Sequence, residues 1–326
     1  MKWWAYGLLI ITIPLSVLYL FQLYDQQTYA GGPLTKATNC PYTYINPQRC
    51  EPNVAPKKRE YVELRNDLIT YIDSEKEAGR LTEGAIFFRD LQNGPIISIN
   101  SQDYFIPASL LKLPLMVTYL KKAETDPNVL TAKLKVEGDL QTFDQNIRPG
   151  QSAEIGKEYT REELLTLLIA QSDNVSWKVL LGDLRKNYSE EDFVGTLSDL
   201  GIVDPRKQDD QQYITVQNYA SIYRILYNSS YLNADMSNKA LGILSKSEFK
   251  DGIVAGVPSN VQVAHKFGEQ KNGNEQQLHD CGLVYYPPSP YTICVMTKGT
   301  NINNLEAVIQ KVSKDVYAEV EKRNAD

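Results

Sequence analysis

The stretch that decides the fold is "YFIPASLLKLPLMVTYLKK", residues 104–122. An apolar helical run follows Pro107, and its first turn carries a hydroxyl, Ser109, and an amine, Lys112. Positions i and i+3 share a helix face, so the amine can reach the Ser109 oxygen. The same spacing recurs in "SEFK", residues 247–250, so one Ser-x-x-Lys match identifies nothing by itself.

Context distinguishes the first match. Ser109 lies at a predicted helix start, where backbone N–H groups stabilise negative charge. Downstream, "QSDN" (171–174) falls between two predicted helices, and "HKFG" (265–268) ends a predicted strand. The Ser172 hydroxyl can relay a proton, the Asn174 amide can donate to a substrate amide, and Lys266 can bind a carboxylate. Gly268 would let the backbone pass close to a ligand. These residue types together favour a serine nucleophile that is activated by an amine.

The flanking sequence predicts an α+β fold. Apolar periodicity predicts strands near both ends of the domain and helices between them. The expected strands cover 84–91, 95–100, 261–267, 281–286 and 291–297. The expected helices cover 59–79, 108–123, 160–171, 174–184, 190–200, 215–228, 237–246 and 303–322. The two ends should therefore meet in one antiparallel sheet, with the helical block inserted as a second lobe.

In this order the three motifs resemble the S-x-x-K, S-D-N and K-T-G signature of class A β-lactamases and penicillin-binding proteins. The resemblance extends over residues 59–326 and implies their three-layer α/β/α fold. It also implies an oxyanion site made by the backbone N–H groups of Ser109 and Glu269. We expect a monomeric catalytic domain that needs no cofactor.

Two departures from the family pattern stand out. Phe267 replaces the hydroxyl residue that normally hydrogen-bonds the substrate carboxylate. Between Gly201 and Thr215 there is no glutamate to activate a deacylating water. Asp209 and Asp210 are candidate bases in that segment, and the other interpretation makes them solvated loop charges.

Three functions follow from these features. The first is a serine hydrolase of the class A β-lactamase type, acylated at Ser109 by β-lactams, with deacylation that is slow. The second is a D,D-peptidase that acts on peptidoglycan stem peptides. The third is a catalytically silent protein that keeps the fold and binds cell-wall peptide. Phe267 and the short loop favour the last two, whereas the intact Ser, Lys, Ser, Asn and Lys set favours the first.

The N-terminal sequence predicts a membrane anchor. Trp3 to Tyr24 runs 22 residues without a charge, which is long enough to span a bilayer. We expect an anchor over 1–24, an extracytoplasmic linker over 25–58, and the domain over 59–326. The alternative is a signal peptide cleaved after "TYA", before Gly31. In either case the domain is exported across the cell membrane.

The composition excludes several other classes. The chain has 326 residues, 42% of them apolar and 23% charged, which suits a globular enzyme. A net charge of −6 and interspersed basic residues exclude a nucleic-acid partner. Only two histidines are present and no Cys-x-x-Cys spacing occurs, so we expect no metal site. Cys40 and Cys50 bracket a short loop, and a disulfide there and one between Cys281 and Cys294 are open possibilities beside free thiols.

Overall fold

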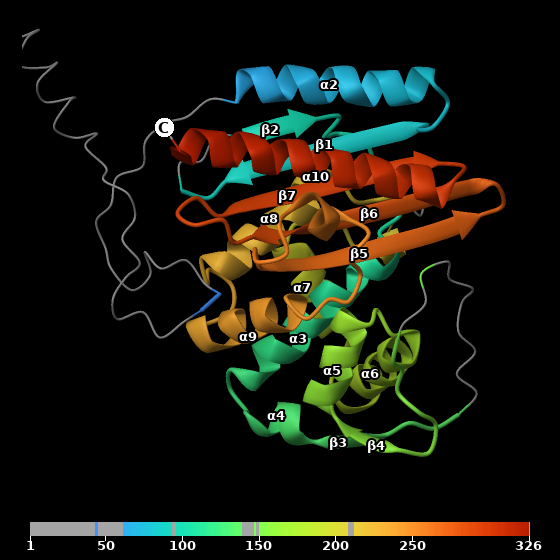
Figure 1. The fold of residues 1–326 in the computed structure, drawn as a ribbon. Helices are drawn as coiled ribbons and strands as arrows, with labels where there is room; N and C mark the ends of the chain where they lie inside the picture. Colours follow the sequence, from blue (N-terminus) through green and yellow to red (C-terminus); the bar gives the residue numbers. More distant parts are fainter. Residues whose placement is uncertain are drawn as a thin grey trace, which may run out of the picture.

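The two ends of the domain meet in one five-stranded antiparallel sheet (Figure 1). Its strands, in spatial order, are β2 (Ile96–Ile99), β1 (Glu83–Asp90), β7 (Tyr291–Gly299), β6 (Glu275–Val284) and β5 (Val263–Asn272). The structure, a computed structural model, describes residues 43–44, 61–92, 96–138, 147, 150–207 and 212–325. β1 pairs with β7 along its whole length, from Glu83 opposite Lys298 to Asp90 opposite Tyr291. This pairing of early and late strands confirms the predicted topology.

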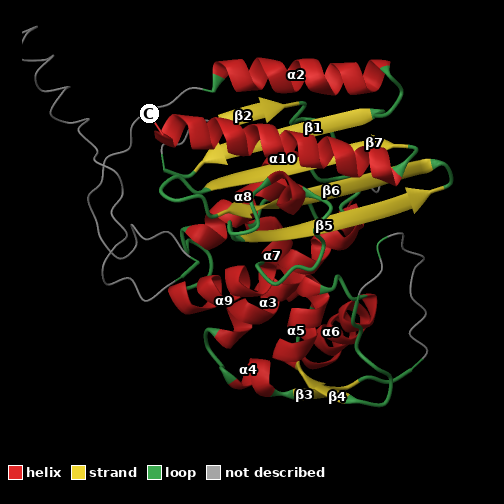
Figure 2. Ribbon diagram, viewed as in Figure 1, coloured by secondary structure: helices red, strands yellow, loops and turns green. Residues whose placement is uncertain are grey.

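Helices cover both faces of the sheet, so the architecture has three layers (Figure 2). On one face lie α2 (Val62–Glu77) and the C-terminal α10 (Ile302–Ala325). Their apolar residues, such as Leu68 and Val312, pack with alternate sheet residues such as Phe88 and Val295 into one buried cluster. The predicted α+β fold is therefore confirmed.

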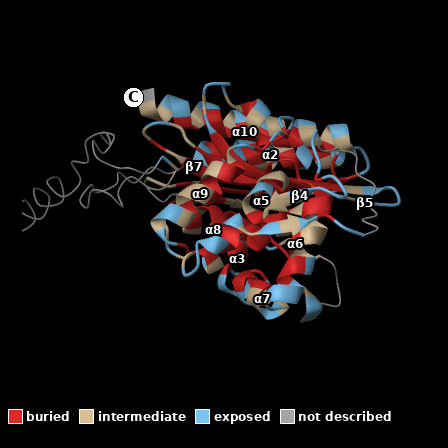
Figure 3. Cartoon of the chain, turned by 90° about the horizontal axis from the view of Figure 1, so that it is seen from below, coloured by how far each residue is buried: buried red, intermediate tan, exposed pale blue. Residues whose placement is uncertain are grey.

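The helical lobe covers the opposite face. Its elements are η2 (Ala108–Leu111), α3 (Lys112–Ala123), α4 (Asn128–Thr131), α5 (Arg161–Ala170), α6 (Asn174–Asn187), α7 (Glu190–Asp199), η3 (Pro205–Lys207), α8 (Val216–Tyr227) and α9 (Ala234–Leu244). The short η4 (Ile253–Gly256) precedes β5 and packs against α10. Buried residues gather on the sheet and on the inward helix faces (Figure 3). Two elements of this lobe, η2 and α9, pack against β5.

A buried polar cluster holds α3, α5 and α6 together. Tyr119 on α3 donates to the Leu180 carbonyl (2.6 Å) and to Asp183 on α6 (2.8 Å). Arg161 on α5 donates to both Asp183 carboxylate oxygens, at 2.8 and 2.9 Å. Buried charges are tolerated when they are paired and hydrogen-bonded in this way. The cluster fixes the two helices that begin at the Ser109 and Ser172 motifs.

The structure adds two features to the sequence prediction. A small sheet, β3 (Lys133–Lys135) with β4 (Glu158–Thr160), closes the far end of the lobe. The β5–β6 hairpin is also longer than expected, because both strands continue to a turn at Gly273, whose φ is 59°. Asn-Gly is a hairpin turn signal, so this extension was readable from the sequence.

Cys281 and Cys294 form a cross-strand disulfide. They stand opposite each other in β6 and β7, and both are fully buried. The strand register therefore decides between the two interpretations left open for this pair. Cys40, Cys50 and the expected anchor over 1–24 lie outside the described residues. Within the described ranges, no helix is both long enough and apolar enough to cross a membrane.

Candidate active site

Ser109 stands on the short helix η2, and Lys112 begins α3 directly after it. The Lys112 Nζ lies 3.0 Å from the Ser109 Oγ, so the predicted i, i+3 contact forms. Ala108, just before the serine, has a φ of 47°, in the left-handed region that non-glycine residues rarely adopt. Such strain costs about 1–3 kcal/mol and gathers at functional sites. Ser109 remains partly exposed whereas Lys112 is buried, so the serine faces the open side of the pair.

Ser172 lies between the two lysines. Its Oγ lies 3.1 Å from the Lys112 Nζ and accepts from the Lys266 Nζ at 3.0 Å. Its φ of 53° is a second left-handed value at a non-glycine residue. Asp173 caps α6 by accepting from the backbone N–H groups of Val175 and Ser176. The connection between α5 and α6 thus turns Ser172 inward, where its side chain is buried.

β5 is an edge strand, and its free edge runs along the Ser109 turn. A Cβ at Gly268 would lie 2.9 Å from the Leu110 Cγ and 3.0 Å from the Pro107 carbonyl oxygen. Only glycine therefore allows this approach, and it serves packing against the turn.

The register of β5 also orients the Glu269 backbone. The Tyr285 N–H donates to the Gln262 carbonyl, and the pairing continues through Lys266 opposite Cys281. Antiparallel partners alternate between bonded and non-bonded pairs, so Glu269 turns its N–H to the free edge. That is the orientation an oxyanion donor beside Ser109 requires.

Lys112 is placed to act as a base. Burial lowers the pKa of its amine to about 7, while the charges of Asp173 and Glu269 oppose that shift. Its Nζ donates to two oxygens that can only accept, the Ser172 carbonyl (2.5 Å) and the Asn174 Oδ1 (2.7 Å). A neutral amine has two N–H groups, so its lone pair is left for a hydroxyl. A neutral lysine amine can arise from burial or from a neighbouring cation, and at Lys112 burial is the cause.

Three residues to which the sequence assigned no role form hydrogen bonds with the backbone on either side of Ser109. The Tyr219 hydroxyl on α8 donates to the Leu110 carbonyl at 2.8 Å. The Ile106 N–H donates to the Gln277 Oε1 (3.1 Å), and the Ile106 carbonyl lies 3.0 Å from the His279 Nε2. Burial lowers the pKa of His279 to about 4, so the neutral ring donates through Nε2. No local signal marks these residues, because each occupies an ordinary core position.

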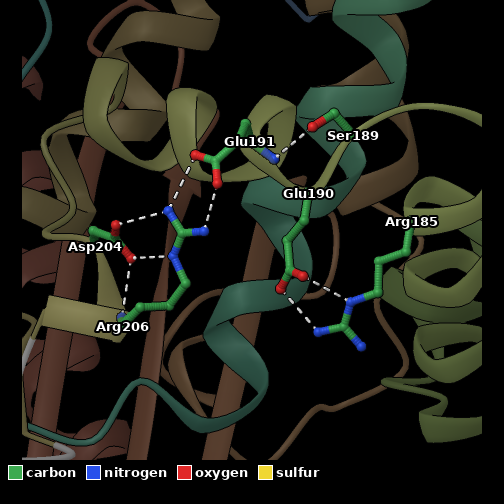
Figure 4. A network of polar contacts seen from close by, with 6 residues as sticks. All are labelled: Arg185, Ser189, Glu190, Glu191, Asp204 and Arg206. Atoms are coloured by element: carbon green, nitrogen blue, oxygen red, sulfur yellow. Dashed lines mark hydrogen bonds and ion pairs between the residues drawn. The ribbon is translucent and has the colours of Figure 1, made fainter.

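One acid of the segment between Gly201 and Thr215, Asp204, is paired with an arginine. Asp204 accepts from Arg206 through both carboxylate oxygens, and Arg206 also pairs with Glu191 (Figure 4). Figure 4 also shows the neighbouring pair of Arg185 with Glu190. Asp204 is therefore engaged in a structural ion-pair network. Asp209 and Asp210, the two candidate bases, lie outside the described residues.

The fold is that of the β-lactamase-like serine hydrolases, and it brings Ser109, Lys112, Ser172 and Lys266 into one cluster. The family model "Beta-lactamase enzyme family" matches residues 65–320, most of the chain. The chain belongs to that family. A search of curated protein sequences found no significant match.

Solved structures with low sequence identity share the fold. An acyl-enzyme complex of a PBP-A mutant with penicillin G has a TM-score of 0.68 at 19% identity, covering 82% of this chain and 100% of PBP-A. The TLA-3 extended-spectrum β-lactamase has a TM-score of 0.68 at 17% identity, with 79% and 98% covered. A class A β-lactamase from Mycobacterium abscessus has a TM-score of 0.64 at 17% identity, with 79% and 99% covered.

Proposed function

We propose that the chain is a serine hydrolase whose Ser109 is acylated by strained or peptide amides of the β-lactam and cell-wall type. Membership of the β-lactamase family and the fold support a serine hydrolase of this kind. The observation that carries the proposal is the contact of the Ser109 Oγ with a buried amine, Lys112, whose pKa is about 7. A nucleophile needs a base of this kind in its neutral form.

Acylation in this proposal transfers the acyl group from the substrate nitrogen to the Ser109 oxygen. The Lys112 lone pair takes the Ser109 proton while the Ser109 Oγ bonds to the substrate carbonyl carbon. The backbone N–H groups of Ser109 and Glu269 stabilise the oxyanion. The Ser172 hydroxyl passes its proton to the leaving nitrogen as the C–N bond breaks and the carbonyl re-forms. Ser172 takes a proton in turn from the Lys112 ammonium, 3.1 Å away, so that Lys112 is neutral again. The Asn174 Oδ1 is occupied by Lys112, so its amide nitrogen is the group that donates to the substrate.

Deacylation is the slower step in this proposal. The segment between Gly201 and Thr215 carries no glutamate, and Asp204 is bound to Arg206. General-base activation of water contributes about 10²–10⁴-fold, so an enzyme without a placed base accumulates its acyl-enzyme. We expect an initial burst and then slow turnover.

Intact-protein mass spectrometry tests the proposal. Residues 1–326 are incubated with nitrocefin, benzylpenicillin and benzylpenicillin methyl ester, and the mass of the acyl group on Ser109 is followed over time. Adduct formation with any of the three supports the proposal. No adduct from any compound would leave a silent binding protein as the better description. Cleavage of a D-Ala-D-Ala peptide together with a persistent adduct would favour the D,D-peptidase.

We also propose that residues 3–24 anchor the domain on the outer side of the cell membrane. The support is the uncharged 22-residue run with aromatic residues near both ends. An anchored chain stays with membranes after a high-salt wash and is released by detergent, because its insertion is hydrophobic. Recovery of a soluble form that begins near Gly31 would show cleavage instead.

A further inference from the structure

The third motif departs from the family pattern at Phe267, and the structure shows what the ring does. Lys266 is fully buried, and its Nζ lies 4.1 Å from the centroid of the Phe267 ring. An ammonium over an aromatic face at this distance is a cation–π contact. The ring itself is only 3% exposed and packs on Phe249 with the centroids 4.4 Å apart. The aromatic pair therefore covers the lysine where a hydroxyl residue would leave a donor.

Lys266 already uses all its donor directions. Its Nζ donates to the Ser172 Oγ at 3.0 Å and to the Phe267 carbonyl at 2.7 Å, and the Phe267 ring takes the third side. An ammonium has three N–H groups. An incoming carboxylate would have to break one of these contacts, and Phe267 offers no donor in exchange.

Negative charge is also already present. Glu269 stands two residues beyond Phe267, on the same strand face. Its Oε1 accepts from the Ile147 N–H at 2.8 Å, which fixes the carboxylate beside the site. Burial lowers the pKa of Lys266 well below its usual range, the charge of Lys112 lowers it further, and the charges of Asp280 and Glu269 oppose both. Glu269 therefore compensates part of the positive charge that Lys266 would offer to an incoming anion.

We propose that the substrate that acylates Ser109 carries no carboxylate beside its scissile amide. Phe267 already contacts the Lys266 amine through its ring and its carbonyl, and the Glu269 carboxylate already compensates part of the lysine charge. The inference rests on the proposed acylation of Ser109. Lys266 is then a positioning residue that holds Ser172. The preferred substrate presents a neutral or cationic group at this place.

The test compares benzylpenicillin with its methyl ester, in which a methyl group caps that carboxylate and removes its charge. Acylation rates are measured by intact mass for the wild type, Phe267→Thr, Glu269→Gln and the control Val263→Thr. Val263 lies on the same strand, four residues earlier, in the same buried cluster. The wild type and the control should react with the ester at least as fast as with the acid.

The two variants should shift this preference toward the acid. Phe267→Thr restores a donor, and about a 10- to 100-fold shift is expected for one hydrogen bond to a charged group. Glu269→Gln removes the opposing charge, keeps an acceptor for Ile147, and should give a shift of several-fold even if Phe267→Thr does not fold. A wild type that prefers the acid tenfold, or variants that leave the preference unchanged, would overturn the proposal.

Binding to the Ser109→Ala variant gives the same comparison without acylation. Isothermal titration with the acid and the ester should show no advantage for the acid, and combining Ser109→Ala with Glu269→Gln should create one. Tighter binding of the acid to Ser109→Ala alone, or no gain in the double variant, would contradict the substrate class. Absence of acylation in every variant would instead count against the proposed function.

Discussion

Two Ser-x-x-Lys segments of this chain, 109–112 and 247–250, have the same spacing and entirely different contacts. In the first, a buried lysine points its amine at the serine hydroxyl from 3.0 Å. In the second, the exposed Lys250 donates to the Ser247 carbonyl at 2.6 Å. The Ser247 hydroxyl is buried and has no hydrogen-bond partner within the described part of the chain.

The difference comes from secondary structure and burial. Ser109 and Lys112 lie on consecutive helical turns, so residues three apart share a face. Residues 247–250 follow the end of α9 in an irregular segment, where that geometry does not exist. Burial adds the lowered pKa, which an exposed lysine in water does not receive. A Ser-x-x-Lys spacing therefore activates the serine only where the two residues begin a helix and the lysine is buried.

The largest expected effect separates the two serines. Ser109→Ala should abolish the covalent adduct with a β-lactam, because the attacking oxygen is gone. Ser247→Ala removes a hydroxyl that has no hydrogen-bond partner among the described residues, so the adduct should form at the wild-type rate. Intact mass measures both. An adduct that persists in Ser109→Ala would place the nucleophile elsewhere.

The second largest effect on acylation is expected from the lysines of the two segments, Lys112 and Lys250. Lys112→Ala should slow acylation by about 10²–10⁴-fold, the contribution of a placed general base. Lys250→Ala should leave the rate unchanged, since that side chain is exposed. Stopped-flow nitrocefin kinetics give the rates, and circular dichroism checks that both variants fold. Comparable losses in folded variants would show that the motif has been chosen wrongly.

The protonation state of Lys112 gives a third test. Its pKa in the folded state is about 7, and the base must be neutral, so acylation should rise about tenfold from pH 6 to pH 8 and then level off. In the unfolded chain the lysine binds a proton up to about pH 10, so it also makes stability rise with pH between 7 and 10. A flat rate profile between pH 6 and 8 would contradict the assignment of this base.

The smallest effect concerns the support of the Ser109 turn. Tyr219→Phe removes the donor to the buried Leu110 carbonyl and should destabilise the fold by about 1–3 kcal/mol. Acylation should slow only a few-fold at unchanged pH dependence, because the turn is positioned less well. Urea denaturation measures the first effect. Tyr227→Phe, on the same helix, is the control, and equal losses in both variants would argue against a special role for Tyr219.

Much of the fold was predictable because its signals are local. The amphipathic helices, the strands at both ends and the capping residues Thr160 and Asp173 are written into neighbouring residues. The short strands β3 and β4 were not predicted, because three-residue strands form through pairing rather than propensity. The order of the motifs predicted one site from Ser109, Ser172 and Lys266, and in the structure Lys112 contacts Ser109 while Ser172 lies between Lys112 and Lys266.

The sequence by itself determined the residue types of the site, their order, and the helix start that makes an i, i+3 pair meaningful. Only the tertiary structure decided which amine is buried, since desolvation depends on atoms far away in the chain. It also decided that Lys266 is covered by the Phe267 ring and shares Ser172 with Lys112. Burial and long-range contacts set the pKa of an amine and the donors left to it, and neither quantity is encoded in a local spacing.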